Sequence, residues 1–258
     1  MEPQNFADWI NKFNLSSEEA SKEIKWPNEQ KFKFHDIIVK IMKYNYVQKE
    51  IIRPYMNKMG IKTCVYCNAA YAVATKDKKA TFQVDHFYPK SEYPFLCVSF
   101  FNLQPSCMHC NQIKAKKTNY QYSMYTDNDT EAELNPFKFS LDDEGIIKYM
   151  LDHNVDSLKF KLKGTNSEND SDSKNHSDFF KLDGLYPQFA DVVEEVVWKG
   201  KVYNKAYRKQ LENMFLNKGF SMSDFKRFYL GFYSNPEDVN KRPLTLLMQS
   251  IAKEMGLE

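Results

Sequence analysis

Four of the five cysteines form two pairs with the same spacing. Two residues separate Cys64 from Cys67, and two separate Cys107 from Cys110. Two such pairs can converge on one tetrahedral zinc ion, because each short loop presents two thiolates to the same metal. Ordinary buried thiols and a redox pair are the alternatives, but the duplication and the lack of a thioredoxin-like βαβ pattern weigh against them. The spacing predicts a structural Zn²⁺ site.

Two further potential ligands lie close to these pairs. Cys97 is part of the apolar run from Phe95 to Val98 and is expected to be a buried thiol. His109 lies inside the second pair, where it could replace a thiolate. Four cysteines already complete a tetrahedral shell, so neither residue is needed as a ligand.

A second set of polar residues lies between the cysteine pairs and directly after them. Its members are Asp85, His86, Asn102, Asn111 and Lys114. Taken singly, an Asp-His dipeptide is usually a surface pair, and an Asn before a Leu is usually a turn or a cap. The functional interpretation therefore depends on their combination.

These residue types suit phosphodiester hydrolysis, which needs a deprotonated water, a cation on the phosphate and a fixed geometry for both. His86 can accept the proton of the water near neutral pH. Asp85 points to the opposite side of a strand from His86 and can bind a hard cation. Asn111 offers a neutral carbonyl oxygen from the first turn of a helix. The pattern predicts Mg²⁺ or Mn²⁺ held by Asp85 and Asn111.

The combination resembles the HNH nucleases of the ββα-metal class, in the branch whose motif is framed by a four-cysteine zinc site. The resemblance covers roughly residues 61–120, and Asn111 in the third motif position makes this an H-N-N variant. It implies a metal-dependent endonuclease that acts on DNA. It further implies that Asn102 fixes the loop carrying the general base. Lys114, one turn past Asn111, shares its helix face, so we expect it to contact the substrate phosphate.

More loosely, the layout is similar to the HNH proteins of bacterial anti-phage systems of the Septu and retron-associated types. In those systems the nuclease acts with an ATPase. The present chain contains no GxxxxGK[ST] phosphate-binding loop. The resemblance therefore implies an ATPase as a separate protein partner.

Two other functional classes remain as alternatives. A zinc-knuckle module that binds nucleic acid or serves as an adaptor, with a decayed active site, should have lost His86, Asp85 or Asn111, and all three are present. A thiol redox protein would need an accessible cysteine of low pKa, and metal analysis would separate it from a zinc protein.

The elements expected around these residues give an α+β fold: a small zinc-stapled ββα-metal core flanked by helices. Ser16 followed by Glu19 indicates a helix start, apolar residues from Phe34 to Tyr46 recur at helical spacing, and Gly60 ends this part. β-prone runs cover 80–84 and 95–101. The expected organisation is an N-terminal helical segment 1–60, a nuclease core 61–125, a strand-bearing segment 126–163, a polar flexible linker 164–178 and a C-terminal helical region 179–258.

The C-terminal part of the chain supports the last three of these divisions. Apolar and polar residues alternate within 136–163, which suggests two or three short strands. Residues 164–178 include no apolar residue, so they are expected to remain a mobile linker. Four helices are expected after it, and aromatic and Met residues among them would be the anchors for a partner: Phe228, Tyr229, Phe232 and Met248.

Composition is compatible with a nucleic-acid enzyme. The chain has 258 residues, 42% of them hydrophobic, and a net charge of +2. Residues 61–120 carry eight lysines and three acidic residues, so positive charge gathers around the motif. No apolar run is long enough to span a membrane, and the N-terminus lacks the pattern of a signal peptide. We therefore expect a soluble cytoplasmic protein.

Overall fold

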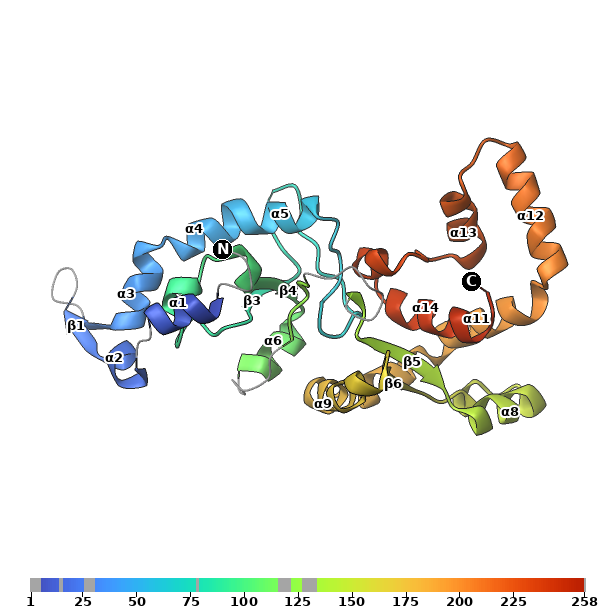
Figure 1. Cartoon of the computed structure of the whole chain (residues 1–258), viewed down its shortest axis with the longest axis horizontal. Helices are drawn as coiled ribbons and strands as arrows, with labels where there is room; N and C mark the ends of the chain where they lie inside the picture. Colours follow the sequence, from blue (N-terminus) through green and yellow to red (C-terminus); the bar gives the residue numbers. More distant parts are fainter. Residues whose placement is uncertain are drawn as a thin grey trace. The chain divides into compact units, whose positions relative to one another are not determined.

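The computed structural model describes residues 6–13, 16–25, 31–77, 79–115, 122–126 and 134–257 (Figure 1). The chain divides into two compact units. Unit 1 comprises Met1–Tyr66 and Ala70–Asp127, and unit 2 comprises Cys67–Ala69 and Asn128–Glu258. Among the described residues, both units contain helices, and unit 1 has two small antiparallel sheets whereas unit 2 has one. The α+β class is therefore confirmed at this level.

Unit 1 begins with mainly helical structure. The Ser16 side chain accepts from the Glu19 backbone N–H and the Glu19 side chain accepts from the Ser16 backbone N–H, a capping box. Gly60 has a φ of 76° after the last helix. The sequence did not predict the hairpin between the helices. The elements are α1 Phe6–Lys12, α2 Ser17–Ser21, β1 Glu23–Lys25, β2 Lys31–Lys33, α3 Phe34–Ile41, α4 Tyr44–Val47, the π-helix η2 Gln48–Ile52 and α5 Arg53–Lys58.

A strand–strand–helix motif forms the rest of unit 1. Strand β3 (Gln83–His86) pairs antiparallel with β4 (Leu103–Ser106), so that Asp85 lies opposite Gln104 and His86 opposite Leu103. Helix α6 (Met108–Ala115) follows β4 directly and packs against β3. This arrangement brings the end of β3 and the first turns of α6 into one region.

The predicted extended run 95–101 is wrong. It is replaced by two 3-10 turns, η3 Pro94–Leu96 and η4 Phe100–Asn102. Pro94 lacks a backbone N–H and has a fixed φ, which favours the first position of a tight turn. The backbone N–H of Cys97 accordingly bonds the Pro94 carbonyl oxygen at 3.2 Å.

One hydrophobic core joins the N-terminal helices to the strand–strand–helix motif. Tyr44, Ile52 and Met56 come from the helices, whereas Val84 and Leu103 come from β3 and β4. Met56 and Leu103 are completely buried. The N-terminal segment is therefore part of the same packed body as the motif and supports it directly.

Unit 2 contains one hairpin and a larger set of helices. Strands β5 (Phe137–Leu141) and β6 (Phe160–Gly164) pair antiparallel. Part of the segment between them, predicted to be extended, forms helix α8 (Asp143–Asp152) instead. The Asp142 side chain caps this helix by accepting from the Gly145 N–H at 2.9 Å.

The predicted linker 164–178 is replaced by the 3-10 turn η6 (Ser167–Asn169) and most of helix α9 (Asp170–Phe180). Its polar side chains are ordered by partners that the sequence pattern does not reveal. The His176 ring lies 4.8 Å from that of Phe137 and 5.0 Å from that of Phe180, and Ser177 Oγ donates to Asp183 at 2.7 Å. Small polar residues can line a packed helix when their hydrogen bonds are satisfied.

The last four C-terminal helices correspond to the four that the sequence predicts, and one short helix before them is additional. They are α10 Leu182–Leu185, α11 Ala190–Val202, α12 Lys205–Asn217, α13 Met222–Leu230 and α14 Thr245–Glu254, with further 3-10 turns η5 Val155–Ser157, η7 Tyr186–Phe189 and η8 Pro236–Lys241. Of the four expected anchors, Tyr229 and Phe232 are buried in the core, Met248 is half-buried and Phe228 is exposed. None of the helices in the described ranges is long and apolar enough to cross a membrane.

Candidate metal sites and catalytic cleft

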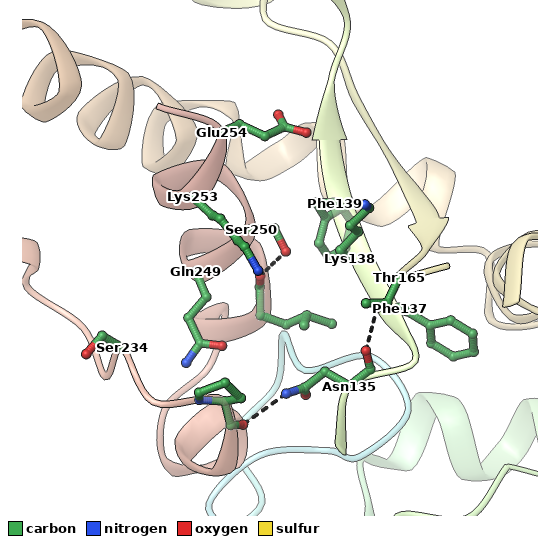
Figure 2. Close-up of a pocket in the computed structure, with 12 residues that line it drawn as sticks. Asn135, Phe137, Lys138, Phe139, Thr165, Ser234, Gln249, Ser250, Lys253 and Glu254 are labelled. Atoms are coloured by element: carbon green, nitrogen blue, oxygen red, sulfur yellow. Dashed lines mark hydrogen bonds between the residues drawn. The ribbon is translucent and has the colours of Figure 1, made fainter. Parts of the chain in front are cut away.

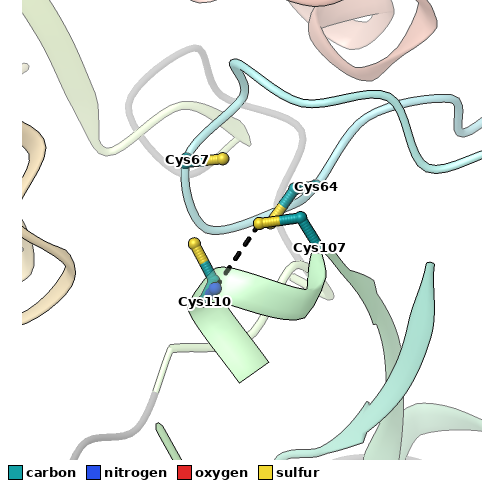
Figure 3. A group of neighbouring side chains, drawn as sticks. All are labelled: Cys64, Cys67, Cys107 and Cys110. Atoms are coloured by element: carbon teal, nitrogen blue, oxygen red, sulfur yellow. Dashed lines mark hydrogen bonds between the residues drawn. The ribbon is translucent and has the colours of Figure 1, made fainter. Parts of the chain in front are cut away.

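The four paired cysteines converge on one point (Figure 3). The Sγ atoms of Cys64, Cys67, Cys107 and Cys110 all lie within 4.8 Å of one another. A tetrahedral zinc site with Zn–S bonds of about 2.3 Å needs sulfur atoms about 3.8 Å apart, so small adjustments suffice. The donor set and its geometry fit Zn²⁺, as the spacing predicts.

Backbone hydrogen bonds shape the loops that carry these cysteines. The Cys64 N–H bonds the Ala70 carbonyl oxygen at 3.0 Å, and the Val65 N–H bonds that of Pro105 at 3.2 Å, which ties the first loop to β4. In the second pair, the Cys110 N–H donates to Cys107 Sγ at 3.4 Å. This N–H–S contact would stabilise a thiolate at that position.

Cys97 does not belong to this cluster. It is completely buried, and its Sγ donates to the sulfur of Met42 at 3.7 Å. Burial raises the pKa of its thiol to about 11, which makes it a poor metal ligand or nucleophile.

The polar motif residues line a separate cleft in unit 1, with a volume of about 570 Å³. Asp85, His86, Asn111 and Lys114 all face it, whereas Asn102 lies behind it as a completely buried residue. The structure therefore brings together four of the five predicted residues in one concave site. The described residues that line it are Tyr44, Asn45, Gln48, Arg53, Gln83, Val84, Asp85, His86, Pro89, Lys90, Ser91, Asn111, Lys114 and Ala115.

His86 has the environment of a neutral base. Its Nε2 lies 3.2 Å from the backbone carbonyl oxygen of Cys97. A carbonyl oxygen can only accept, so this contact assigns the proton to Nε2 and leaves the lone pair on Nδ1. Burial is the main cause that lowers the pKa of His86 to about 4, with Lys90 and Lys114 contributing. The imidazole is therefore neutral at pH 7.

Asn102 joins the two ends of the loop that follows His86. Its Oδ1 accepts from the Tyr88 N–H at 2.7 Å, and its Nδ2 donates to the carbonyl oxygens of Tyr88 at 3.2 Å and Leu96 at 3.0 Å. Because Leu96 precedes Cys97, the same amide fixes the segment whose carbonyl orients His86. These contacts favour the predicted role of Asn102 as a residue that holds the loop.

Asp85 is held by two donors on a single oxygen. Its Oδ2 accepts from the hydroxyl of Tyr66 and from Lys114 Nζ at 2.7 Å. Lys114 Nζ also donates to the His86 carbonyl oxygen at 2.5 Å. Both members of the ion pair are nearly buried, with side chains 7% (Lys114) and 12% (Asp85) exposed. Lys114 thus anchors α6 to β3, and its predicted phosphate contact would require it to leave this pair.

Asn111 is oriented by a residue that the sequence pattern did not indicate. Its Nδ2 donates to Oε1 of Gln83, which lies two residues before Asp85 on the same face of β3. This bond orients the amide, whose carbonyl oxygen is the only atom of the group that can bind a cation. Asp85 Oδ1 and Asn111 Oδ1 are the hard oxygen donors that suit Mg²⁺ or Mn²⁺.

Sequence reasoning also missed the support for Asp85. Gln104, opposite Asp85 in the sheet, donates from Nε2 to the Tyr66 hydroxyl at 2.6 Å and to the Tyr122 carbonyl oxygen at 2.7 Å. Burial and the neighbouring carboxylate raise the pKa of Tyr66 well above its usual value, so its hydroxyl remains a donor. The only sequence signal was the position of Tyr66 between two cysteines.

A second cavity, of about 320 Å³, lies between β5 and α14 in unit 2 (Figure 2). Some of its polar groups bond to one another. Asn135 Nδ2 donates to the Pro236 carbonyl oxygen at 3.0 Å, and Thr165 Oγ1 donates to that of Asn135 at 2.5 Å. No histidine or cysteine is among its described lining residues.

Comparison with known proteins finds a partial similarity. The chain is similar to the Septu protein PtuB of Bacillus thuringiensis, with 38% identity over 63 residues. This stretch makes up 24% of the present chain and 23% of PtuB, so less than a quarter of either protein is matched. No family model and no solved structure matches the chain.

Proposed function

We propose that the chain is a metal-dependent endonuclease of the HNH type that hydrolyses phosphodiester bonds of DNA. The observation that carries this proposal is the convergence of Asp85, His86 and Asn111 on one cleft. Because Nε2 of His86 donates to the Cys97 carbonyl oxygen, Nδ1 of the neutral ring is the atom that can accept a proton. The strand–strand–helix motif and the four-cysteine cluster support this proposal.

In this mechanism, His86 Nδ1 removes the proton of the attacking water. The hydrogen bond to the Cys97 carbonyl oxygen fixes the ring and stabilises the imidazolium that forms. Asn102 holds the loop on which that carbonyl lies. The low pKa of His86 keeps the imidazole in the competent form throughout the neutral range.

Asp85 and Asn111 would hold the divalent cation through one oxygen each. When bound, the cation would neutralise charge on the phosphate and stabilise the leaving oxygen. Tyr66 and Lys114 fix the Asp85 carboxylate by hydrogen bonds to its other oxygen. Gln83 fixes the amide of Asn111. The cysteine cluster, loaded with Zn²⁺, would keep α6 at the end of β4.

The similarity to the Septu protein PtuB supports a role in anti-phage defence. An ATPase is the partner that the resemblance to Septu systems implies. We place the docking surface on the C-terminal helices, where Phe228 on α13 is 64% exposed. Copurification with the products of neighbouring genes tests this. Phe228→Ala should weaken the association of an ATPase, whereas retention of every partner by this variant would exclude α13.

Cleavage of supercoiled plasmid tests the proposed activity. The zinc-loaded protein should nick or linearise DNA when Mg²⁺ or Mn²⁺ is added, and His86→Ala should retain zinc and DNA binding but lose cleavage. A wild-type protein that binds DNA without cutting it under any divalent metal would favour the alternative, a zinc-knuckle module that only binds nucleic acid.

A further inference from the structure

A π-helical turn at the edge of the cleft places Gln48 and Arg53, from the N-terminal helical segment, beside the nuclease motif. In η2, the backbone N–H of Arg53 bonds the carbonyl oxygen of Gln48, five residues earlier. Side chains five residues apart point about 140° apart in an α-helix, whereas the wider π-turn brings them close to one face. Gln48 and Arg53 accordingly both line the cleft. Such turns are frequent at functional sites.

This helix face is connected to the catalytic histidine. The ring of Tyr44, one α-helical turn before Gln48, lies 5.1 Å from that of His86, and Gln48 Nε2 donates to the Tyr44 hydroxyl at 3.1 Å. Lys90, in the loop after β3, places Nζ 4.7 Å from the centre of the Tyr44 ring. The helix and the loop thus form one wall of the cleft.

The charges of this wall point to an anionic ligand. Among the described residues that line the cleft, three side chains are cationic and one is a carboxylate, Asp85, which is paired with Lys114. Arg53 and Lys90 are the other two cationic side chains, and they line the cleft on the same side as Tyr44 and Gln48. A guanidinium matches a phosphate in a bidentate geometry.

We infer that Arg53 and Lys90 bind a backbone phosphate of the DNA substrate, and that Gln48 supports them as a neutral donor. This inference rests on the proposed function. It assigns substrate binding to the N-terminal helical segment, which the motif does not include. Lys114, buried in its ion pair, then acts as a support for Asp85 rather than as the main phosphate ligand.

The test compares binding of a fluorescent DNA duplex, without Mg²⁺ or Mn²⁺, over a range of salt concentrations. Arg53→Gln should weaken affinity about tenfold or more and lower the slope of log Kd against log salt by about 0.9, the value for one phosphate contact. Arg53→Lys should keep the slope and recover part of the affinity. Lys90→Gln, on a loop, should also lower the slope.

Lys49→Gln is the matched control, because Lys49 is a 61% exposed cation on the same helix that does not line the cleft. Its affinity should stay within about twofold of the wild type. If the wild type binds and cleaves DNA but Arg53→Gln and Lys90→Gln behave like Lys49→Gln, the inference fails alone. If the wild type neither binds nor cleaves, the proposed function fails as well.

Discussion

Replacing Lys114 by Met should destabilise unit 1 strongly. The substitution leaves the Asp85 carboxylate, 12% exposed, without the ammonium group that lies 2.7 Å from its Oδ2. At an effective dielectric constant of about 20, two unit charges at that distance attract each other by about 6 kcal/mol. Desolvation offsets part of this attraction, and breaking a buried pair on one side typically costs about 3–5 kcal/mol. We expect a loss within that range.

Hydrogen exchange of the β3 and α6 amides measures this loss, because the exchange rates of these amides report the free energy of opening of unit 1 itself. Lys79→Met is the matched control, since Lys79 forms an exposed ion pair with Asp77 at 3.5 Å. That variant should lose less than about 1 kcal/mol. The double variant Lys114→Met with Asp85→Asn should recover much of the loss, because no buried charge remains.

A divalent cation should also rescue Lys114→Met. If Asp85 binds Mg²⁺ or Mn²⁺, saturating metal should stabilise this variant more than the wild type, since the cation supplies the charge that the ammonium group provided. A loss no larger than that of Lys79→Met would contradict the buried pair. A full loss without metal rescue would contradict Asp85 as a cation ligand.

Three further outcomes follow from the same contacts. Purified protein should contain about one zinc per chain, which elemental analysis checks. Cys64→Ser or Cys110→Ser should unfold the motif, as circular dichroism will show, since such a site contributes on the order of 10 kcal/mol to the free energy of folding. Asn102→Ala should lower the free energy of unfolding by on the order of 3 kcal/mol, because it leaves buried backbone groups of the loop without partners, as denaturant unfolding will show. The His86 imidazole should titrate by NMR at about pH 4, so that stability is constant above pH 6.5 and falls as the pH drops from 6.5 to 4; a midpoint near 6.5 would exclude the buried neutral ring.

Sequence alone predicted the cysteine cluster and four residues of the cleft because the spacing of these residues is a local signal. Cys64, Cys67, Asp85, His86 and Asn111 lie on short loops or at element ends, where spacing fixes direction. Helices with clear apolar periodicity and caps were also predicted, because these signals lie within a few neighbouring residues.

The remaining features depend on contacts between distant segments. Arg53 lies more than 30 residues before His86, and only the π-turn and the shared core bring it to the cleft. Helix α9 has a polar sequence whose order comes from partners such as Phe137 and Asp183. The ion pair of Lys114 was missed because helical spacing alone suggested a side chain directed at substrate.

The position of a bound cation tests the central claim most directly. Crystals of the zinc-loaded protein soaked in Mn²⁺ can be measured at wavelengths where the anomalous signals of zinc and manganese differ. The account predicts a zinc peak among the four cysteines and a manganese peak in the cleft, at about 2.1 Å from oxygens of Asp85 and Asn111 and beside His86. A zinc peak together with a cleft that contains no manganese at saturating concentration would contradict the account.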